Sequence, residues 1–178
     1  MKKFGLIGNP ISGSLSPKLF RAAYPDSDMT YDLIETDSAA TALDIFRREY
    51  DAVNVTAPFK ESAFSAARQA DPICRRLGVA NILLKRNGTI QAANTDFLAV
   101  TGILKEQKAR FKDANVMVIG CGGAGRSAAL ASSRLHLTTL VANRDFGKAR
   151  EFCFRHGGMA PIPLEKIAEQ VALNDIGI

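Results

Sequence analysis

The sequence predicts an α/β protein in two parts: a mixed, mainly parallel sheet with helices, followed by a second and incomplete α/β unit. Short apolar segments alternate with helical segments along the first half, which is typical of βαβ units. The pair Asn87-Gly88 lies between two apolar runs and predicts a hairpin, because both residues tolerate a positive φ. In the second half, the apolar run Val116–Ile119 leads directly into a glycine-rich turn and a helix.

The first half is expected to contain five strands, of which the last returns antiparallel after the hairpin. These strands are Phe4–Ile7, Tyr31–Ile34, Ala52–Val55, Val79–Leu84 and Ile90–Ala93. Helices are expected at Pro17–Ala23, Ala39–Glu49 and Lys60–Ala67. This half therefore predicts a mixed sheet covered by helices.

The second half begins with an expected connecting helix at residues 96–108 and a polar stretch, Lys105–Asn115, which is typical of a domain boundary. We assign residues 1–96 to the first domain and residues 97–178 to the second. The second domain is expected to contain strands at Asn115–Ile119, Thr138–Ala142 and Ala160–Ile162, helices at Gly125–Leu135, Lys148–Arg155 and Leu164–Gln170, and a further strand starting at Asp175. This is little more than one of the two βαβαβ halves of a dinucleotide-binding domain.

The turn after the Val116–Ile119 run has the pattern Gly-x-Gly-x-x-Gly and predicts a Rossmann-like dinucleotide-binding domain. The first glycine allows the tight turn, the second lets the backbone approach a pyrophosphate, and the third lets the helix pack on the strand. A turn that binds no ligand is the alternative. The expected contacts in the turn are Gly120, Gly122, Gly123, Ala124 and Gly125.

The following strand ends in Asn143-Arg144, where proteins that bind NAD usually carry an acidic residue for the ribose hydroxyls. A cation at this place suits the 2′-phosphate of NADP instead. The sequence therefore predicts NADP as the cofactor, with Asn143 and Arg144 among its contacts.

Composition excludes several other classes of protein. The chain has 47% hydrophobic and 23% charged residues, a net charge of +5 and scattered basic residues, so it is an ordinary globular sequence and no nucleic acid partner is expected. Cys74, Cys121 and Cys153 are odd in number and form no C-x-x-C, which argues against a disulfide framework and against a metal site. No apolar run is long enough for a signal peptide or a membrane span, so we expect a cytoplasmic protein with no membrane partner.

Four polar segments of the first half are each expected to follow a strand: residues 8–17, 54–60, 78–81 and 94–96. The carboxyl ends of parallel strands meet in the crevice where α/β proteins bind ligands, so these segments should converge. Their hydroxyl, amine, amide and carboxylate groups suit a polyhydroxylated carboxylic acid.

On these four segments and the glycine turn, the chain resembles the shikimate dehydrogenase family, which includes shikimate/quinate dehydrogenases. Its members are NADP-dependent oxidoreductases of aromatic amino-acid and chorismate biosynthesis, and the resemblance covers essentially the whole chain. It implies reversible reduction of 3-dehydroshikimate to shikimate by hydride transfer, with quinate as substrate or NAD as cofactor as alternatives. The residue roles that it implies are carboxylate binding by Ser14 and Ser16, ring-hydroxyl binding by Thr56, Asn81 and Asp96, catalysis by Lys60, and 2′-phosphate binding by residues 142–144 with Lys148.

The chemistry agrees with this resemblance, because oxidising a secondary alcohol requires a group that takes the hydroxyl proton. Lys60 is the expected acid/base, with Asp96 as the catalytic partner that orients it. Each also has a structural alternative: Lys60 as a surface lysine at a helix start, Asp96 as a helix cap, and Ser14 and Ser16 as loop formers.

The chain departs from the family pattern at three places. Residues 18–21 replace a segment that ends in His-Asn, Ile82 stands where a Thr is common, and the second domain ends early. We expect either a fragment or a naturally short variant that compensates by association, such as a homodimer, because an incomplete sheet exposes an edge. A non-catalytic paralogue that binds a shikimate-like ligand or a nucleotide is the alternative function.

Overall fold

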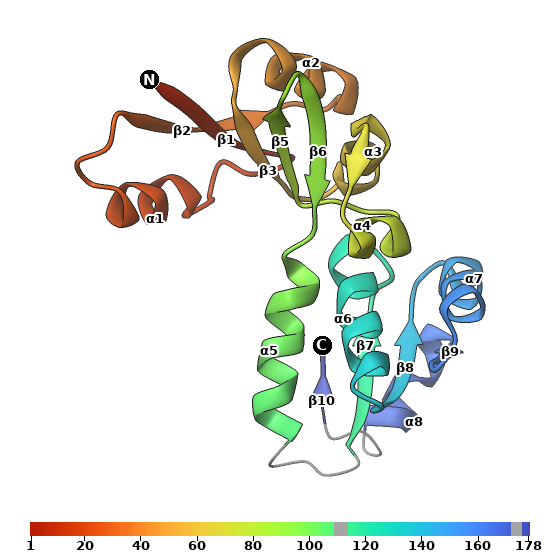
Figure 1. Cartoon of the computed structure of the whole chain (residues 1–178). Coiled ribbons are helices and arrows are strands. Elements are labelled where there is room, and N and C mark those ends of the chain that lie inside the picture. The colour runs from red at the N-terminus through yellow and green to blue at the C-terminus, as the bar shows by residue number, and fades with distance from the viewer. Residues whose placement is uncertain (109–113, 172–175) are drawn as a thin grey trace. The chain divides into compact units, whose positions relative to one another are not determined.

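The computed structural model describes residues 1–108, 114–171 and 176–178 (Figure 1). The chain forms two compact units, Met1–Asn94 and Thr95–Ile178, each with its own sheet. Helix α5 (Asp96–Lys108) belongs to the second unit, because it packs extensively against α6 (Gly123–Arg134). The chain therefore passes between the units before α5, ahead of the polar stretch at which the sequence suggested a boundary.

The first unit contains a mixed sheet, as expected, but the sheet has six strands instead of the expected five. Its order is β2 (Met29–Glu35), β1 (Lys2–Gly8), β3 (Ala52–Val55), β5 (Ile82–Arg86), β6 (Thr89–Ala93) and β4 (Gln69–Ala70). Strand β1 pairs parallel with β2 and β3, whereas β5 runs antiparallel to β3 and β6. The end of β3, the start of β5 and the end of β6 consequently lie at the same edge of the sheet.

The helices of this unit are α1 (Ser16–Ala23), α2 (Ala39–Glu49), α3 (Lys60–Ala66) and α4 (Pro72–Leu77). Helices α2 and α3 cover one face, where Phe46 and Ala63 join Ile7, Val53 and Leu83 in the hydrophobic core. Helix α1 contributes no buried residue and contacts β2. The hydrophobic core therefore holds the centre of the sheet, and the polar segments at the strand ends are attached to this packed sheet.

The second unit is a parallel sheet in the order β10 (Ile176–Gly177), β7 (Asn115–Ile119), β8 (Thr138–Ala142) and β9 (Ala160–Ile162). Helix α6 connects β7 to β8, and α7 (Phe146–His156) connects β8 to β9. The parallel β-α-β order confirms the Rossmann-like prediction. The strand expected from Asp175 is found at β10, while Asp175 itself lies outside the described residues.

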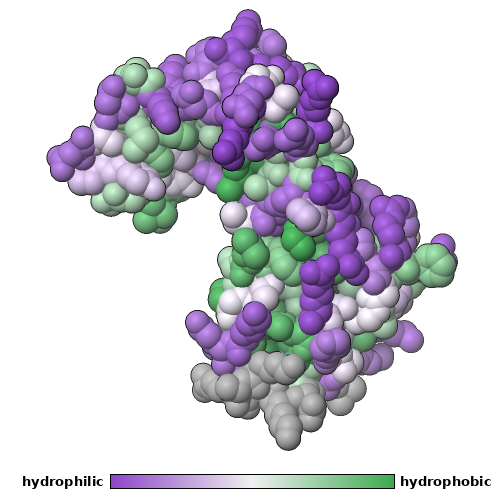
Figure 2. Space-filling view, viewed as in Figure 1, coloured by the Kyte–Doolittle hydropathy of each residue, from purple (hydrophilic) through white to green (hydrophobic). Residues whose placement is uncertain are grey.

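The last helix begins as a 3₁₀ turn at Leu164–Lys166 and continues as α8 (Ile167–Val171), so the expected helix Leu164–Gln170 has an irregular start. The Lys166 amide donates to the Pro163 carbonyl at 3.1 Å, and this bond between residues three apart closes the tighter first turn. Helix α5 buries Phe97 and Leu104 but leaves the apolar side chains of Leu98 and Ile103 exposed. Figure 2 shows hydrophobic residues on the visible side of the second unit.

Within residues 1–108, 114–171 and 176–178, no helix has the length and apolar character that a membrane crossing requires. The same part of the chain holds no group of three or more His, Cys, Asp or Glu side chains that could bind a metal ion. None of the three cysteines forms a disulfide, and all three are buried.

Candidate functional site

The loop between β1 and α1 forms a pocket with the residue that follows β3, and three of the lining residues carry hydroxyl groups. The pocket has a volume of about 390 Å³ and is lined by Leu6, Pro10, Ile11, Gly13, Ser14, Ser16 and Thr56. A Cβ at Gly8 would lie 2.4 Å from Thr56 Cγ2, so only glycine lets β1 end this close to Thr56. The Thr56 amide donates to the Ile7 carbonyl at 2.8 Å, which fixes the two segments together.

Ser14 and Ser16 are coupled to each other inside this pocket. The Ser14 hydroxyl donates to Ser16 Oγ at 3.1 Å, and the Ser16 amide donates to Ser14 Oγ at 3.2 Å. Ser14 therefore shapes the entry to α1, and both hydroxyls also line the pocket. The loop-forming and ligand-binding alternatives are compatible in this geometry.

Lys60 and Asn81 are held near each other by backbone hydrogen bonds. The Ala80 amide donates to the Lys60 carbonyl at 2.9 Å, and the Val55 amide donates to the Asn81 carbonyl at 2.8 Å. Lys60 is half-buried at the first position of α3, whereas Asn81 is 8% exposed. These bonds bring Lys60 and Asn81 to the edge where β3 ends.

The expectation that Asn81 follows a strand is wrong, because residues 78–80 precede β5 and are not part of it. The hairpin reverses the chain direction, so β5 runs antiparallel to β3 and starts at the edge where β3 ends. Asn81 reaches the expected edge for this reason.

Asp96 lies in the second unit and shares a pocket with the glycine turn. This pocket has a volume of about 300 Å³ and is lined by Asp96, Ala99, Val100, Val118, Ile119, Ala124, Gly125, Ala128 and Ile178. Helix α5 starts at Asp96, so this carboxylate occupies the first turn, where the helix dipole stabilises a negative charge. Lys60 belongs to the first unit and Asp96 to the second.

The three glycines of the turn differ in what their surroundings demand. Gly120 has a φ of +113°, a conformation that other residues rarely adopt. A Cβ at Gly125 would lie 1.8 Å from the Gly120 carbonyl oxygen, so α6 packs on the turn without room for a side chain. A Cβ at Gly122 would meet no atom within 4 Å, which leaves the N-terminus of α6 open to an approaching ligand.

The side chain of Asn143 braces this turn. Asn143 Oδ1 accepts a hydrogen bond from the Cys121 amide at 3.0 Å, and its Nδ2 donates to the Asp145 carbonyl at 2.8 Å. Arg126 also holds the turn, since its Nε donates to the Cys121 carbonyl at 3.2 Å. The sequence reasoning missed Arg126, although its place directly after the third glycine was a usable signal.

Arg144 and Lys148 are both exposed, close to the start of α7. Asp145 caps this helix, because its Oδ1 accepts from the Lys148 amide at 3.2 Å. Three features form a donor set that suits a dinucleotide with an additional phosphate. They are the open N-terminus of α6, Gly122, where a Cβ would meet no atom within 4 Å, and the exposed cations Arg144 and Lys148 after β8. The residues present therefore fit NADP.

Asp71 is a second residue that the sequence reasoning missed. Its Oδ1 accepts from the Cys74 amide at 2.6 Å and so caps α4, while its Oδ2 accepts from the Asn94 amide at 3.0 Å. Asn94 is 2% exposed, and its Nδ2 donates to the Val79 carbonyl at 3.5 Å. The Asp71 carboxylate thereby connects the start of α4 with Asn94 at the end of the first unit, and the Asn94 side chain continues the connection to the loop before Asn81.

Two family models match the chain: residues 6–83 match the shikimate dehydrogenase substrate binding domain, and residues 103–178 match shikimate / quinate 5-dehydrogenase. The shikimate dehydrogenase (NADP(+)) of Halobacterium salinarum is 35% identical over 165 residues, which cover 90% of this chain and 62% of that protein. The chain thus spans about 62% of the length of this curated relative.

Solved structures give the same result. The shikimate dehydrogenase of Mycobacterium tuberculosis has a TM-score of 0.82 and 28% identity, covering 99% of this chain and 70% of that one. Shikimate 5-dehydrogenase of Thermus thermophilus, in complex with NADP(H) and shikimate, has a TM-score of 0.75 and 31% identity, covering 95% of this chain and 66% of that one.

Proposed function

The chain belongs to the shikimate dehydrogenase family, and on this premise we propose that it acts in the NADP-dependent, reversible reduction of 3-dehydroshikimate to shikimate. The observation that carries the proposal is the pocket that joins Ser14, Ser16 and Thr56 at the sheet edge to which Lys60 and Asn81 are also bound. We infer from these backbone hydrogen bonds that the Lys60 amine and the Asn81 amide serve the same substrate as the three hydroxyls.

The first unit is the proposed substrate-binding part. Ser14 and Ser16 would donate hydrogen bonds to the substrate carboxylate, because two coupled hydroxyls in one pocket can turn their protons toward an anion. Thr56 and Asn81 would bind ring hydroxyls. The net charge of +5 raises the local concentration of an anionic substrate.

The second unit is the proposed cofactor-binding part, and NADP is the cofactor named for several curated relatives. When bound, NADP would accept a hydride from the alcohol and NADPH would return it. Gly122 and the N-terminus of α6 would receive the pyrophosphate, and Arg144 with Lys148 would bind the 2′-phosphate.

Lys60 is the proposed acid/base. Its amine nitrogen takes the hydroxyl proton as the alcohol is oxidised and returns that proton when the ketone is reduced, a role typically worth ~10²- to 10⁴-fold in rate. Asp96 is the proposed partner of Lys60 in orienting the reacting hydroxyl.

The compartment and assembly are further parts of the proposal. Buried cysteines that form no disulfide suit a reducing compartment, so we propose that the protein is cytoplasmic. The exposed apolar side chains Leu98 and Ile103 of α5 support association of two copies, which light scattering would detect as a doubled mass.

The test is formation of NADPH by the purified chain with shikimate and NADP, compared with quinate and with NAD. The proposal expects turnover that is fastest with shikimate and NADP. Turnover preferring quinate or NAD would reassign the substrate or the cofactor. Binding of both ligands by folded protein without hydride transfer would replace the dehydrogenase by a binding function.

A further inference from the structure

The serine loop, residues 9–15, joins β1 to the start of α1 and is anchored to β2 by a carboxylate. The Ile11 amide donates to Glu35 Oε2 at 2.9 Å, and Glu35 is the last residue of β2. Within the loop, the Ser14 amide donates to the Ile11 carbonyl at 2.8 Å. The backbone of Ile11 therefore links Ser14 to Glu35.

The register of the sheet brings Glu35 to this loop. Gly8, the last residue of β1, is paired with Glu35 where β1 and β2 run parallel. Ile11 folds back over the same place, because a Cβ at Gly8 would lie 2.6 Å from Ile11 Cγ2. The Ile11 side chain is 5% exposed and lines the same pocket as Ser14 and Ser16. Glu35 thus holds a residue that forms part of the pocket wall.

The start of the serine loop is bound to the segments on both sides of β1. The Asn9 amide donates to the Ala57 carbonyl at 3.1 Å, just after β3. The Asn9 side chain donates to the Asp37 carboxylate, just after β2. Of these three anchors of the loop, the bond from Ile11 to Glu35 is the one nearest in the chain to the serines.

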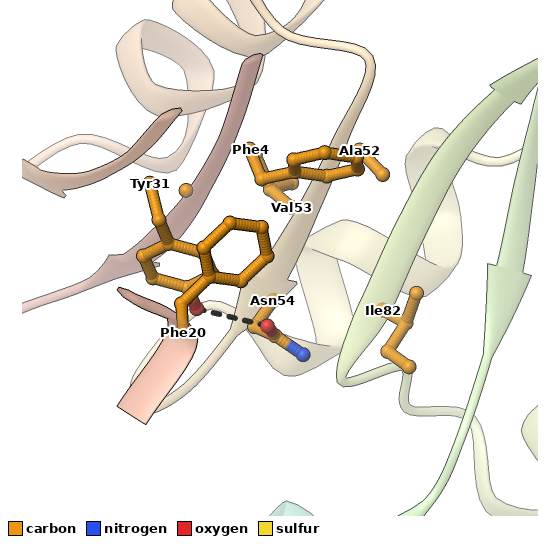
Figure 3. A pocket seen from close by; sticks show the side chains of 8 residues that line it. Phe4, Phe20, Tyr31, Ala52, Val53, Asn54 and Ile82 are labelled. Carbon is orange, nitrogen blue, oxygen red and sulfur yellow. Dashed lines mark hydrogen bonds between the residues drawn. The ribbon is translucent and has the colours of Figure 1, made fainter. Parts of the chain in front are cut away.

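Helix α1, at the other end of the loop, is held by aromatic packing. It contributes no buried residue, and its Phe20 ring lies 5.0 Å from the Tyr31 ring and 5.4 Å from the Phe4 ring, centroid to centroid (Figure 3). The Tyr31 hydroxyl in turn donates to Asn54 Oδ1 at 2.8 Å, the dashed line in Figure 3. Phe20 lies one helical turn beyond Ser16, so this packing holds the helix and leaves the loop backbone to its own anchors.

We propose that Glu35 is a positioning residue for substrate binding: by accepting the Ile11 amide, it keeps the serine loop in the arrangement that binds the substrate carboxylate. This inference rests on the proposed function, in which Ser14 and Ser16 bind that carboxylate. A loop that is ordered before the substrate arrives does not subtract its ordering from the free energy of binding. The role requires an acceptor oxygen rather than a charge, because the partner is a backbone amide.

The experiment measures shikimate affinity by calorimetry for the wild type, Glu35→Ala and Glu35→Gln. We expect Glu35→Ala to bind about 3- to 10-fold more weakly, because a loop that adopts the binding arrangement for only about a third to a tenth of the time weakens binding by the same factor. Glu35→Gln should recover most of the affinity, since its side-chain oxygen can accept the same hydrogen bond. A Glu35→Gln variant as weak as Glu35→Ala would overturn the inference.

Asp32→Ala is the matched control, because it removes another exposed carboxylate from β2. Asp32 Oδ2 accepts from the Tyr50 hydroxyl at 3.2 Å, and Tyr50 lies outside the serine loop. We expect Asp32→Ala to bind shikimate like the wild type. The same loss of affinity in Asp32→Ala and Glu35→Ala would indicate a general effect of charge and overturn the inference.

Kinetics separate positioning from a general loss of structure. Positioning raises KM for shikimate and leaves kcat unchanged, because the carboxylate is bound equally in the ground and transition states. A variant that is merely destabilised would bind fewer equivalents of shikimate per chain at the wild-type dissociation constant and have a lower kcat, and this result would overturn the inference. If Glu35→Ala does not fold, Glu35→Asp, whose carboxylate is one methylene shorter, carries the same expectation.

The outcomes distinguish this inference from the proposed function. Shikimate binding by the wild type with equal binding by Glu35→Ala overturns the inference alone. No shikimate binding by the folded wild type overturns both the inference and the proposed substrate.

Discussion

Replacing Gly125 by alanine tests how the glycine turn is built. A Cβ at this position would lie 1.8 Å from the Gly120 carbonyl oxygen and 2.8 Å from its carbon, whereas real Cβ contacts essentially never fall below 3.0 Å. The oxygen contact is short by 1.2 Å, and the neighbour is backbone, which cannot rotate away as a side chain would. Either α6 or the turn must therefore move.

Such overpacking typically costs ~1–3 kcal/mol, and a backbone clash favours the upper end, so Gly125→Ala should lower the free energy of unfolding by about 3 kcal/mol. Displacing the turn should also weaken NADP binding. Urea unfolding followed by circular dichroism measures the first effect, and fluorescence titration measures the second.

Two other glycines supply matched controls. Gly122→Ala meets no atom within 4 Å and has a φ of −81°, so it should lose at most about 1 kcal/mol of stability while it still weakens NADP binding. Gly102→Ala, inside α5 and equally open, should raise stability by about 0.5–1 kcal/mol. The packing argument is refuted if Gly125→Ala is as stable as Gly122→Ala.

Three further changes have defined outcomes. Arg144→Ala should weaken NADP binding by ~10- to 100-fold while leaving NAD binding unchanged, because it removes a charge-assisted contact; equal losses for both nucleotides would exclude a role at the 2′-phosphate. Asp71→Ala should lower the free energy of unfolding by ~1–3 kcal/mol, because both carboxylate oxygens accept amide hydrogen bonds, and an unchanged urea midpoint would contradict this. Burial raises the pKa of the Cys74 thiol to about 12 and of Cys153 to about 11 from an ordinary 9.0, so the folded state holds these protons more tightly. Stability should therefore fall as the pH rises above about 9, measured by urea unfolding between about pH 8 and pH 10.5, and a rise over this range would reverse the assigned sign.

The sequence predicted the second unit best. Strands β7, β8 and β9 have the expected bounds. Each is short, and a residue that interrupts strands follows it: Gly120 after β7, Asn143 after β8 and Pro163 after β9. In the first unit, α4 and β4 were missed since they contain six and two residues, too few for a periodic pattern. The Asp71-Pro72 pair was nevertheless a helix-start signal, with a capping residue followed by a proline.

The site was less predictable than the fold, because its connections join residues that are far apart in the chain. Asn143 binds the Cys121 amide across 22 positions, and Tyr31 binds Asn54 across 23. Periodicity carries no information on such pairs. Motif spacing identified Ser14 and Thr56 as neighbours, whereas the bracing role of Asn143 required the three-dimensional arrangement.

The most direct test of the proposed function is the turnover of Lys60→Ala relative to its shikimate affinity. We predict that kcat for NADPH formation falls by ~10²- to 10⁴-fold, while the dissociation constant for shikimate, measured by calorimetry, changes little. Lys85→Ala serves as the control, because Lys85 is an exposed lysine of β5 whose amine lies over the Phe46 ring and lines neither pocket of the proposed site. A Lys60→Ala variant that turns over shikimate like the wild type would contradict the assignment of Lys60 as the acid/base.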